Sequence, residues 1–120
     1  MTAERPHVAW AEVTIDSCDT ARAAEFWSSL LDLPARPAQP EGWFQLGPAT
    51  AGGPVINIQP VPEAKVGKSR IHLDFWVSNL EAAIALAERL GARRVEDHTH
   101  GQWRIAVMAD PEGIEFCLVA

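Results

Sequence analysis

The feature that most constrains the fold is an approximate internal repeat of 60 residues, half of the 120-residue chain. Shifting the sequence by this period aligns five identical pairs, which are Ala23/Ala83, Leu30/Leu90, Trp43/Trp103, Ala49/Ala109 and Gly53/Gly113. A fixed period that does not drift indicates two copies of one supersecondary unit. Two such open units can close on each other around a cleft. We therefore expect the functional site in that cleft.

Composition sets the broad class of the protein. With 48% hydrophobic and 22% charged residues, a 120-residue chain is typical of a single globular domain. The net charge of -6 argues against nucleic acid as a partner and suits a neutral or cationic ligand. No apolar run approaches the ~20 residues of a membrane span. Two cysteines and no signal-peptide pattern predict a reducing, cytoplasmic environment.

The first copy is predicted to run from about residue 8 to 60, with the order strand, helix and three strands. Polar and apolar residues alternate from Val8 to Asp16, as in a half-buried strand. A helix follows, with Asp19 or Ser17 as its N-cap and Pro34 as its stop. Three short strands are then predicted near residues 35–38, 42–47 and 54–60.

The second copy repeats this order from about residue 70 to 120, after a linker at about 61–69. Its first strand is predicted at 70–77, and Ser78 and Glu81 form a capping-box pattern at the start of the helix. Gly91 ends that helix, and strands are predicted near 92–97, 102–109 and 114–119. The fold class expected is α+β, with two tandem βαβββ modules.

Three segments resemble the vicinal oxygen chelate superfamily, and most closely its glyoxalase-like domain branch. They are residues 19–27 (DTARAAEFW), 68–74 (KSRIHLD) and 109–118 (ADPEGIEFCL). The superfamily includes glyoxalase I, bleomycin-resistance proteins and extradiol dioxygenases. The resemblance implies paired βαβββ modules that curl into a half-open barrel around a cleft, and it implies a homodimer.

The resemblance also implies places for a divalent metal on the first and last strands of each module. In this sequence these places hold Glu12, Asn57 (or Gln59), His72 and Cys117 (or Glu115). Members that need a metal usually have histidine or glutamate there, so the metal set expected here is Glu12, His72 and Glu115. Zinc, nickel, manganese and iron are the candidate ions, and a buried Cys117 with no metal role is the simpler interpretation of that residue.

Without a metal, the polar strand faces indicate acid–base chemistry. His72 and Glu12 form the candidate catalytic pair, in which Glu12 orients the imidazole or takes a substrate proton itself. A structural network of Arg70, His72 and Asp74 at the module junction is the alternative interpretation. Five tryptophans indicate an aromatic wall for a flat or cationic ligand. The candidate ligand-binding residues are Trp76, Asp74, Asn57, Gln59, Trp10 and Trp103.

Two functions of different classes remain open. The first is a glyoxalase-like lyase or isomerase that moves a proton beside a carbonyl. The second is a non-catalytic binding protein that sequesters a small molecule, as bleomycin-resistance proteins do. Glutathione-dependent glyoxalase I activity is not expected, because the metal set of that enzyme is not met. The sequence does not identify the ligand.

Overall fold

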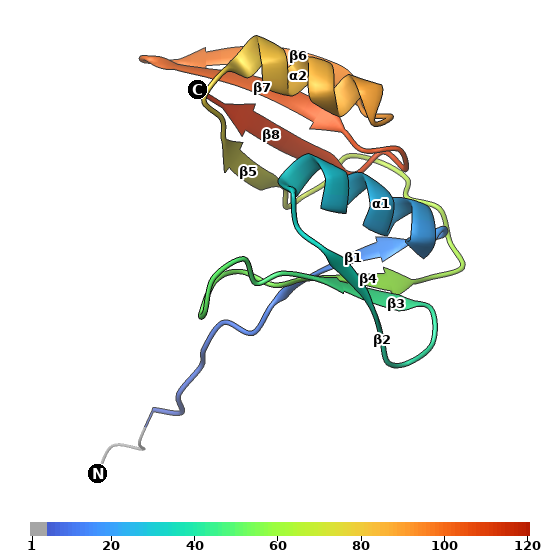
Figure 1. The fold of residues 1–120 in the computed structure, drawn as a ribbon. Helices are drawn as coiled ribbons and strands as arrows, with labels where there is room; N and C mark the ends of the chain where they lie inside the picture. Colours follow the sequence, from blue (N-terminus) through green and yellow to red (C-terminus); the bar gives the residue numbers. More distant parts are fainter. Residues whose placement is uncertain (1–4) are drawn as a thin grey trace.

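A computed structural model describes residues 5–120, which form two modules of the same topology (Figure 1). Module one contains β1 (Val13–Ser17), α1 (Thr20–Leu31), β2 (Ala35–Ala38), β3 (Trp43–Leu46) and β4 (Ile56–Pro60). Module two contains β5 (Leu73–Trp76), α2 (Leu80–Arg89), β6 (Arg93–His100), β7 (Trp103–Ala109) and β8 (Glu115–Val119). The predicted α+β fold of two tandem βαβββ modules is confirmed.

Each module folds its four strands into one sheet, and the 60-residue period is kept in the strand pairing. Sheet A has the order β1-β4-β3-β2 and sheet B the order β5-β8-β7-β6. The parallel pair of sheet A places Val13 opposite Ile56, and the parallel pair of sheet B places Leu73 opposite Phe116. Both members of the second pair are 60 residues beyond their counterparts. The repeat therefore holds at the level of single strand partners.

Several predicted boundaries differ from the structure. The strand predicted at 70–77 spans only Leu73–Trp76, because its pairing with β8 is limited to these residues. The first strand begins at Val13 instead of Val8, because its partner β4 starts only after Pro54, which has no N–H to donate. Asn79 caps α2 instead of Ser78, because its side chain accepts the Ala82 amide hydrogen as the helix starts at the buried Leu80. The strand predicted to end near residue 97 continues to His100, where β6 still pairs with β7.

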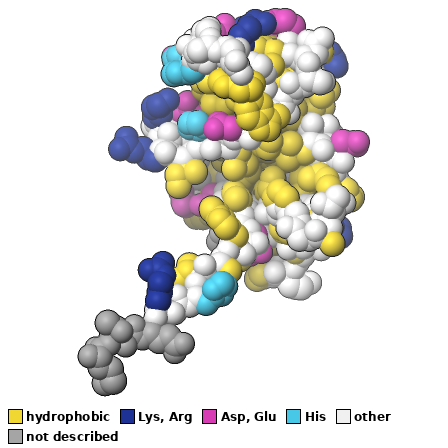
Figure 2. Space-filling view, turned by 90° about the vertical axis from the view of Figure 1, so that its left-hand side faces the viewer, with side chains coloured by type: hydrophobic (Ala, Val, Ile, Leu, Met, Phe, Trp, Pro, Cys, Tyr) yellow, Lys and Arg dark blue, Asp and Glu magenta, His cyan; other side chains and the backbone are white. Residues whose placement is uncertain are grey.

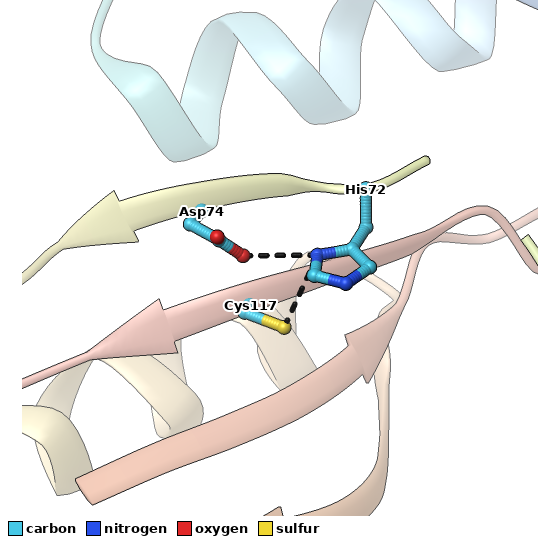
Figure 3. Close-up of side chains that lie close together, drawn as sticks. All are labelled: His72, Asp74 and Cys117. Atoms are coloured by element: carbon cyan, nitrogen blue, oxygen red, sulfur yellow. Dashed lines mark hydrogen bonds and ion pairs between the residues drawn. The ribbon is translucent and has the colours of Figure 1, made fainter. Parts of the chain in front are cut away.

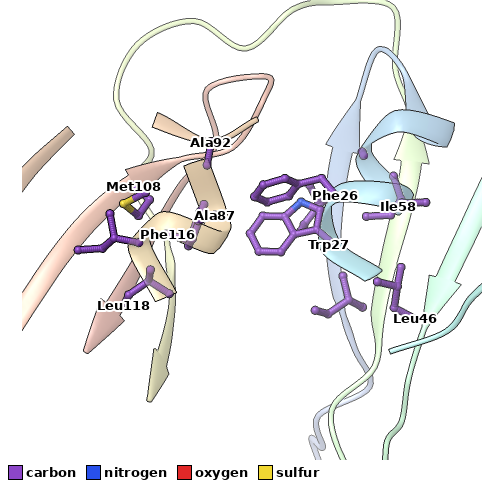
Figure 4. Close-up of a cluster of buried hydrophobic side chains, with 14 of the residues drawn as sticks. Phe26, Trp27, Leu46, Ile58, Ala87, Ala92, Met108, Phe116 and Leu118 are labelled. Atoms are coloured by element: carbon purple, nitrogen blue, oxygen red, sulfur yellow. The ribbon is translucent and has the colours of Figure 1, made fainter. Parts of the chain in front are cut away.

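One hydrophobic core joins the two modules, and α1 lies at its centre. Phe26 and Trp27 of α1 lie between the buried residues of sheet A and those of sheet B (Figure 4). The ring of Trp27 is 5.1 Å from that of Phe116 between centroids and 6.1 Å from that of Phe75. The side chains on the helix-facing sides of both sheets therefore belong to the core, and the other faces of the sheets do not.

Polar contacts hold the same junction together. Trp27 donates its indole N–H to the buried carboxylate of Asp110, at 3.3 Å. Glu112 accepts from the Ser17 hydroxyl at 2.5 Å and from the Cys18 amide at 2.7 Å. Both acidic residues belong to the turn between β7 and β8, so this turn of module two fixes β1 and α1 of module one. Within residues 5–120, no helix is long and apolar enough to cross a membrane.

Candidate functional site

The face of sheet B that points away from the core carries an unusual set of side chains. On β5, Leu73 and Phe75 pack against the core, so the alternating Asp74 and Trp76 point the other way and are exposed. The pairing of β5 with β8 places Cys117 opposite Asp74. We call this side of sheet B the open face. Its members are His72, Asp74, Trp76, Trp103, Ile105, Val107, Glu115, Cys117 and Val119.

His72, Asp74 and Cys117 form a compact cluster on the open face (Figure 3). His72 directly precedes β5, and its Nδ1 is 2.9 Å from Oδ1 of Asp74. The same nitrogen is 3.6 Å from Sγ of Cys117. The His72 and Asp74 side chains are about half exposed, whereas Cys117 is buried. A ligand on the open face would therefore reach the imidazole and the carboxylate first.

The geometry leaves one nitrogen of the imidazole available. When His72 is neutral and donates its Nδ1 hydrogen to Asp74, the lone pair of the ring is on Nε2. Within the part of the chain that the structure describes, no hydrogen bond engages Nε2. A carboxylate that orients a histidine in this way is a recurring arrangement for a general base.

The carboxylate also affects the thiol beside it. Burial, followed by the hydrogen bond and the negative charge of Asp74, raises the pKa of Cys117 to about 11. The charge of Glu115 acts in the same direction. Cys117 is therefore a protonated thiol at neutral pH unless a cation binds beside it. An arrangement in which Cys117 alone acts as the nucleophile is disfavoured, because the nucleophile is the thiolate.

The donor atoms of the cluster fit a divalent metal such as zinc. An imidazole nitrogen, a carboxylate oxygen and a thiol sulfur lie within 4.8 Å of one another. A tetrahedral zinc ion with bonds of about 2.0–2.3 Å needs ligand atoms roughly 3.3–3.8 Å apart, and the His72–Cys117 distance of 3.6 Å already lies in this range. Three protein ligands leave a fourth position open, as in catalytic zinc sites.

The predicted metal ligands Glu12 and Glu115 lie outside this cluster. Glu12 precedes β1 and lines a separate cavity with Trp10 and the segment 52–55. Glu115 accepts from the Ser69 amide at 3.0 Å and pairs with Lys68 at 3.2 Å. The Ser69 hydrogen bond is the main cause that lowers the pKa of Glu115. Of the predicted set, only His72 belongs to the cluster, and Asp74 and Cys117 are its neighbours.

The remaining predicted ligand-binding residues lie in three places. Asn57 is buried on β4, where its side chain accepts a hydrogen bond from Gln45, and Gln59 lies two residues further along the same strand. Trp10 is 93% exposed and lies before β1. Trp76 and Trp103 lie together on the open face, with ring centroids 4.9 Å apart.

A cavity of about 660 Å³ lies where the two modules meet, as expected for a cleft between repeats. From module one it is lined by Trp10, Thr14 and Asp16, and from module two by Arg70, His72 and Glu115, among others. His72 is thus the cluster residue that reaches both the open face and the space between the modules.

The sequence analysis named Asp74 beside His72 only in the alternative, structural network, and gave Glu12 as the catalytic partner. The alternation of His72 and Asp74 along one strand places both side chains on one face, and the structure brings these two into contact. The approach of Cys117 depends on the pairing of β5 with β8, which brings together residues 45 positions apart. No local pattern carries that information.

Comparison with known proteins agrees with the fold and the module order. The glyoxalase-like domain family matches residues 12–119, which is most of the chain. No curated protein matches the chain. Several solved structures share the fold at low sequence identity.

One similar structure is a glyoxalase/bleomycin resistance protein/dioxygenase family enzyme from Burkholderia phytofirmans PsJN, with a TM-score of 0.74 and 19% identity over 90% of this chain and 94% of that one. Another is the fosfomycin resistance protein FosX from Mesorhizobium loti, with a TM-score of 0.72 and 15% identity over 93% and 91%. A mutant FosX from Listeria monocytogenes, complexed with Mn(II) and dihydroxypropylphosphonic acid, gives 0.77 and 14% over 94% and 90%. The repeat, the sheet topology and the family match together show that this chain belongs to the glyoxalase-like domain family of the vicinal oxygen chelate superfamily.

Proposed function

We propose that the protein binds a small molecule on the open face and acts as a lyase or isomerase that moves a proton beside a carbonyl group. The observation that supports this most strongly is the 2.9 Å contact of His72 Nδ1 with Asp74, which leaves Nε2 free to act as a base. In this proposal Asp74 orients the imidazole. Glu12 stays a predicted acid, although it lies in a different cavity from His72.

The proton transfer follows from the position of Nε2. His72 takes a proton from the carbon next to the carbonyl, and the electrons of that C–H bond form an enolate. In an α-hydroxy carbonyl compound, the imidazolium then returns the proton to the former carbonyl carbon while the hydroxyl proton passes to the former carbonyl oxygen, which completes the isomerisation. Asp74 stabilises the transient imidazolium, because a carboxylate hydrogen-bonded to a charged ring is a charge-assisted pair.

The test is turnover of a panel of α-hydroxy and α-keto carbonyl compounds by the wild type and by His72→Ala. Loss of a general base lowers turnover by about 10²–10⁴-fold. Asp74→Asn should lower kcat by a smaller factor. His98→Ala is the matched control, because His98 is a half-exposed histidine that pairs with Glu96 on β6. Undiminished turnover in His72→Ala would refute this function.

The same cluster supports a divalent metal cofactor as an alternative to the base role of His72, because an imidazole nitrogen that binds the ion no longer donates its hydrogen to Asp74. His72, Asp74 and Cys117 would hold the ion, and their nitrogen, oxygen and sulfur donors favour zinc over the harder manganese. A bound ion would supply Lewis-acid polarisation of a ligand oxygen. Nickel and iron(II) belong in the same screen.

Elemental analysis of tag-free protein tests the metal. We expect close to one zinc per chain, lost in both His72→Ala and Cys117→Ser and retained in Cys18→Ser. Cys18 is the other free cysteine and lies outside the cluster, so it controls for loss of a thiol as such. Zinc that persists in Cys117→Ser would show that it binds elsewhere.

The second candidate is a binding protein that sequesters its ligand without chemical change. The exposed pair of Trp76 and Trp103 favours it, because stacking surfaces bind flat molecules without a catalytic group. Recovery of unchanged ligand after binding would support this function, and recovery of a converted product would exclude it.

We also propose that the working unit is a homodimer. The non-core faces of both sheets lie away from the joint core that α1 fills (Figure 4), so they are available to contact a second chain. The exposed side chains of Trp10 and Ile71 indicate that part of the surface beside these faces is covered in the functional assembly.

A further inference from the structure

Two tryptophans meet on the open face at the end opposite His72. Trp76 comes from the last position of β5 and Trp103 from the first position of β7. Their ring centroids are 4.9 Å apart and the ring planes are inclined by 56°. Trp76 is 74% exposed and Trp103 is 42% exposed, although tryptophans are usually largely buried. The two rings thus form an open angle that faces solvent.

This aromatic angle is one wall of a distinct cavity. The cavity has a volume of about 270 Å³ and is lined by Asp74, Phe75, Trp76, His100, Trp103, Ile105 and Val119. Ile105 and Val119 are strand partners, so they supply an apolar floor beside the rings. Among these lining residues, only Asp74 and His100 are polar.

The charged side chain that lines the cavity is negative. Asp74 is a carboxylate whose side chain is 59% exposed, and no lysine or arginine is among the lining residues. The neighbouring Arg104 is held at 2.9 Å by Glu81 of α2, which directs it away from this face. Figure 2 shows hydrophobic side chains gathered in the middle of one face of the molecule, with histidine and acidic side chains beside them. The net charge of the chain, -6, also favours a cation over an anion as the ligand.

We propose that this cavity binds the methylated ammonium group of a small organic cation, with the rings of Trp76 and Trp103 in cation–π contact and Asp74 as the counter-charge. Tryptophan is the strongest aromatic partner for a cation, and pairs of rings recognise methylated ammonium groups. The inference names the ligand class for the proposed site and rests on the open face being the binding surface.

The degree of methylation follows from the lining. A primary ammonium group carries three N–H donors and loses affinity where they lack acceptors. This cavity offers few acceptors and much apolar surface, so it suits methyl groups around the nitrogen. Asp74 supplies the counter-charge only while it binds no metal ion, so the titration below uses metal-free protein.

The test is a titration of the full-length protein with tetramethylammonium chloride, followed by the indole N–H signals of the five tryptophans in ¹H–¹⁵N spectra. We expect saturable shifts of the Trp76 and Trp103 signals, assigned with the corresponding variants, and no shift of the buried Trp27. Sodium chloride at equal ionic strength, ammonium chloride and tert-butanol serve as controls for salt, for methylation and for shape without charge. All three should bind at least tenfold more weakly.

Variants separate the contribution of the aromatic rings from that of the carboxylate. Trp76→Leu and Trp103→Leu should each weaken tetramethylammonium binding by about threefold to thirtyfold, the range of cation–π energies at partly exposed sites. Asp74→Asn should weaken binding of the cation and leave that of tert-butanol unchanged. Trp43→Phe, in module one, is the matched control and should keep wild-type affinity.

Two outcomes overturn the inference. Equal binding of tert-butanol and tetramethylammonium would make the cavity a purely apolar groove. If Trp76→Leu changes the sedimentation coefficient but keeps the affinity for the cation, the tryptophan pair is an interface between two copies of the chain and not a cation site. Because this titration needs no turnover, its failure with an intact His72-dependent reaction would refute the ligand class alone. Conversely, cation binding that persists in His72→Ala without any reaction in the wild type would refute only the catalytic proposal.

Discussion

At the scale of single residues, the chemistry of the site depends on one carboxylate. Asp74 contacts Nδ1 of His72 and raises the pKa of the buried Cys117, so it connects the base and the thiol. Replacing Asp74 should therefore change both the action of His72 as a base and the reactivity of the Cys117 thiol. The exposed fraction of its side chain, 59%, means that a ligand or cation can also reach it directly.

Alkylation of Cys117 measures this coupling. With the pKa of the thiol at about 11, its reaction with iodoacetamide in metal-free Cys18→Ser protein should be slow at pH 8 and still rise with pH above 9. Asp74→Asn removes a hydrogen bond and a negative charge that both favour the protonated thiol, so the rate at pH 8 should rise several-fold. Asp16→Asn, in module one, is the control and should not change the rate. A rate that levels off near pH 9 in the wild type would contradict the raised pKa.

At the scale of elements, the end of α1 combines two unfavourable features. Asp32 caps the helix with φ of 54° and ψ of 48°, a left-handed conformation that disfavours side chains other than glycine. Its carboxylate also lies at the negative end of the helix dipole. The amide of Asp32 bonds the carbonyl of Ser28, so the backbone geometry is needed to close the helix.

Asp32→Gly should therefore stabilise the protein. We expect the free energy of unfolding to rise by about 0.5–1 kcal/mol, measured by urea denaturation. Asp32→Asn separates the causes, because it removes the charge and keeps a side chain that tolerates this conformation. Asp32→Ala should be less stable than both Asp32→Gly and Asp32→Asn, because alanine tolerates the left-handed conformation less well than glycine or asparagine. A loss of stability in Asp32→Gly would show that the carboxylate makes a contact that outweighs the backbone strain.

At the scale of the whole molecule, the turn between β7 and β8 determines how the modules are placed. Asp110 is 4% exposed and accepts hydrogen bonds from Trp27 and from the amides of Glu112 and Ile114. Burial raises the pKa of Asp110 above its ordinary value of 3.8, and the hydrogen bonds oppose this effect. Trp27 belongs to module one, so this single carboxylate joins the turn to the central helix.

Asp110→Ala should lower the free energy of unfolding by about 1–3 kcal/mol, because buried donors lose their acceptor. Asp97→Ala, which removes an exposed carboxylate of β6, should change the free energy of unfolding by less than about 0.5 kcal/mol.

The contribution of Asp110 to the free energy of unfolding also depends on pH. A raised pKa in the folded state favours the protonated form, so the contribution of Asp110 is complete below pH 3.8 and declines as pH rises through the folded pKa. Asp110→Asn should lack this decline, and an unchanged profile would contradict it.

The sequence by itself determined the two modules, their order of elements and their core faces. These properties depend on local periodicity, and the apolar stripe of α1 and the alternation of β5 can be seen without any partner. It also predicted that His72, Asp74 and Trp76 share one strand face, and the structure leaves all three exposed. Because the repeat has a fixed period of 60 residues, the order of elements predicted for one module also applies to the other.

Only the tertiary structure decided which of these side chains meet. Glu12 was expected beside His72, but Asp74 and Cys117 occupy that place, because β8 pairs with β5 while the segment before Val13 has no strand to pair with. The contact between Trp76 and Trp103 likewise depends on the lateral order of three strands. Contacts between distant segments arise from strand register and packing, and a periodic pattern fixes the face of a residue but not its neighbour across the sheet.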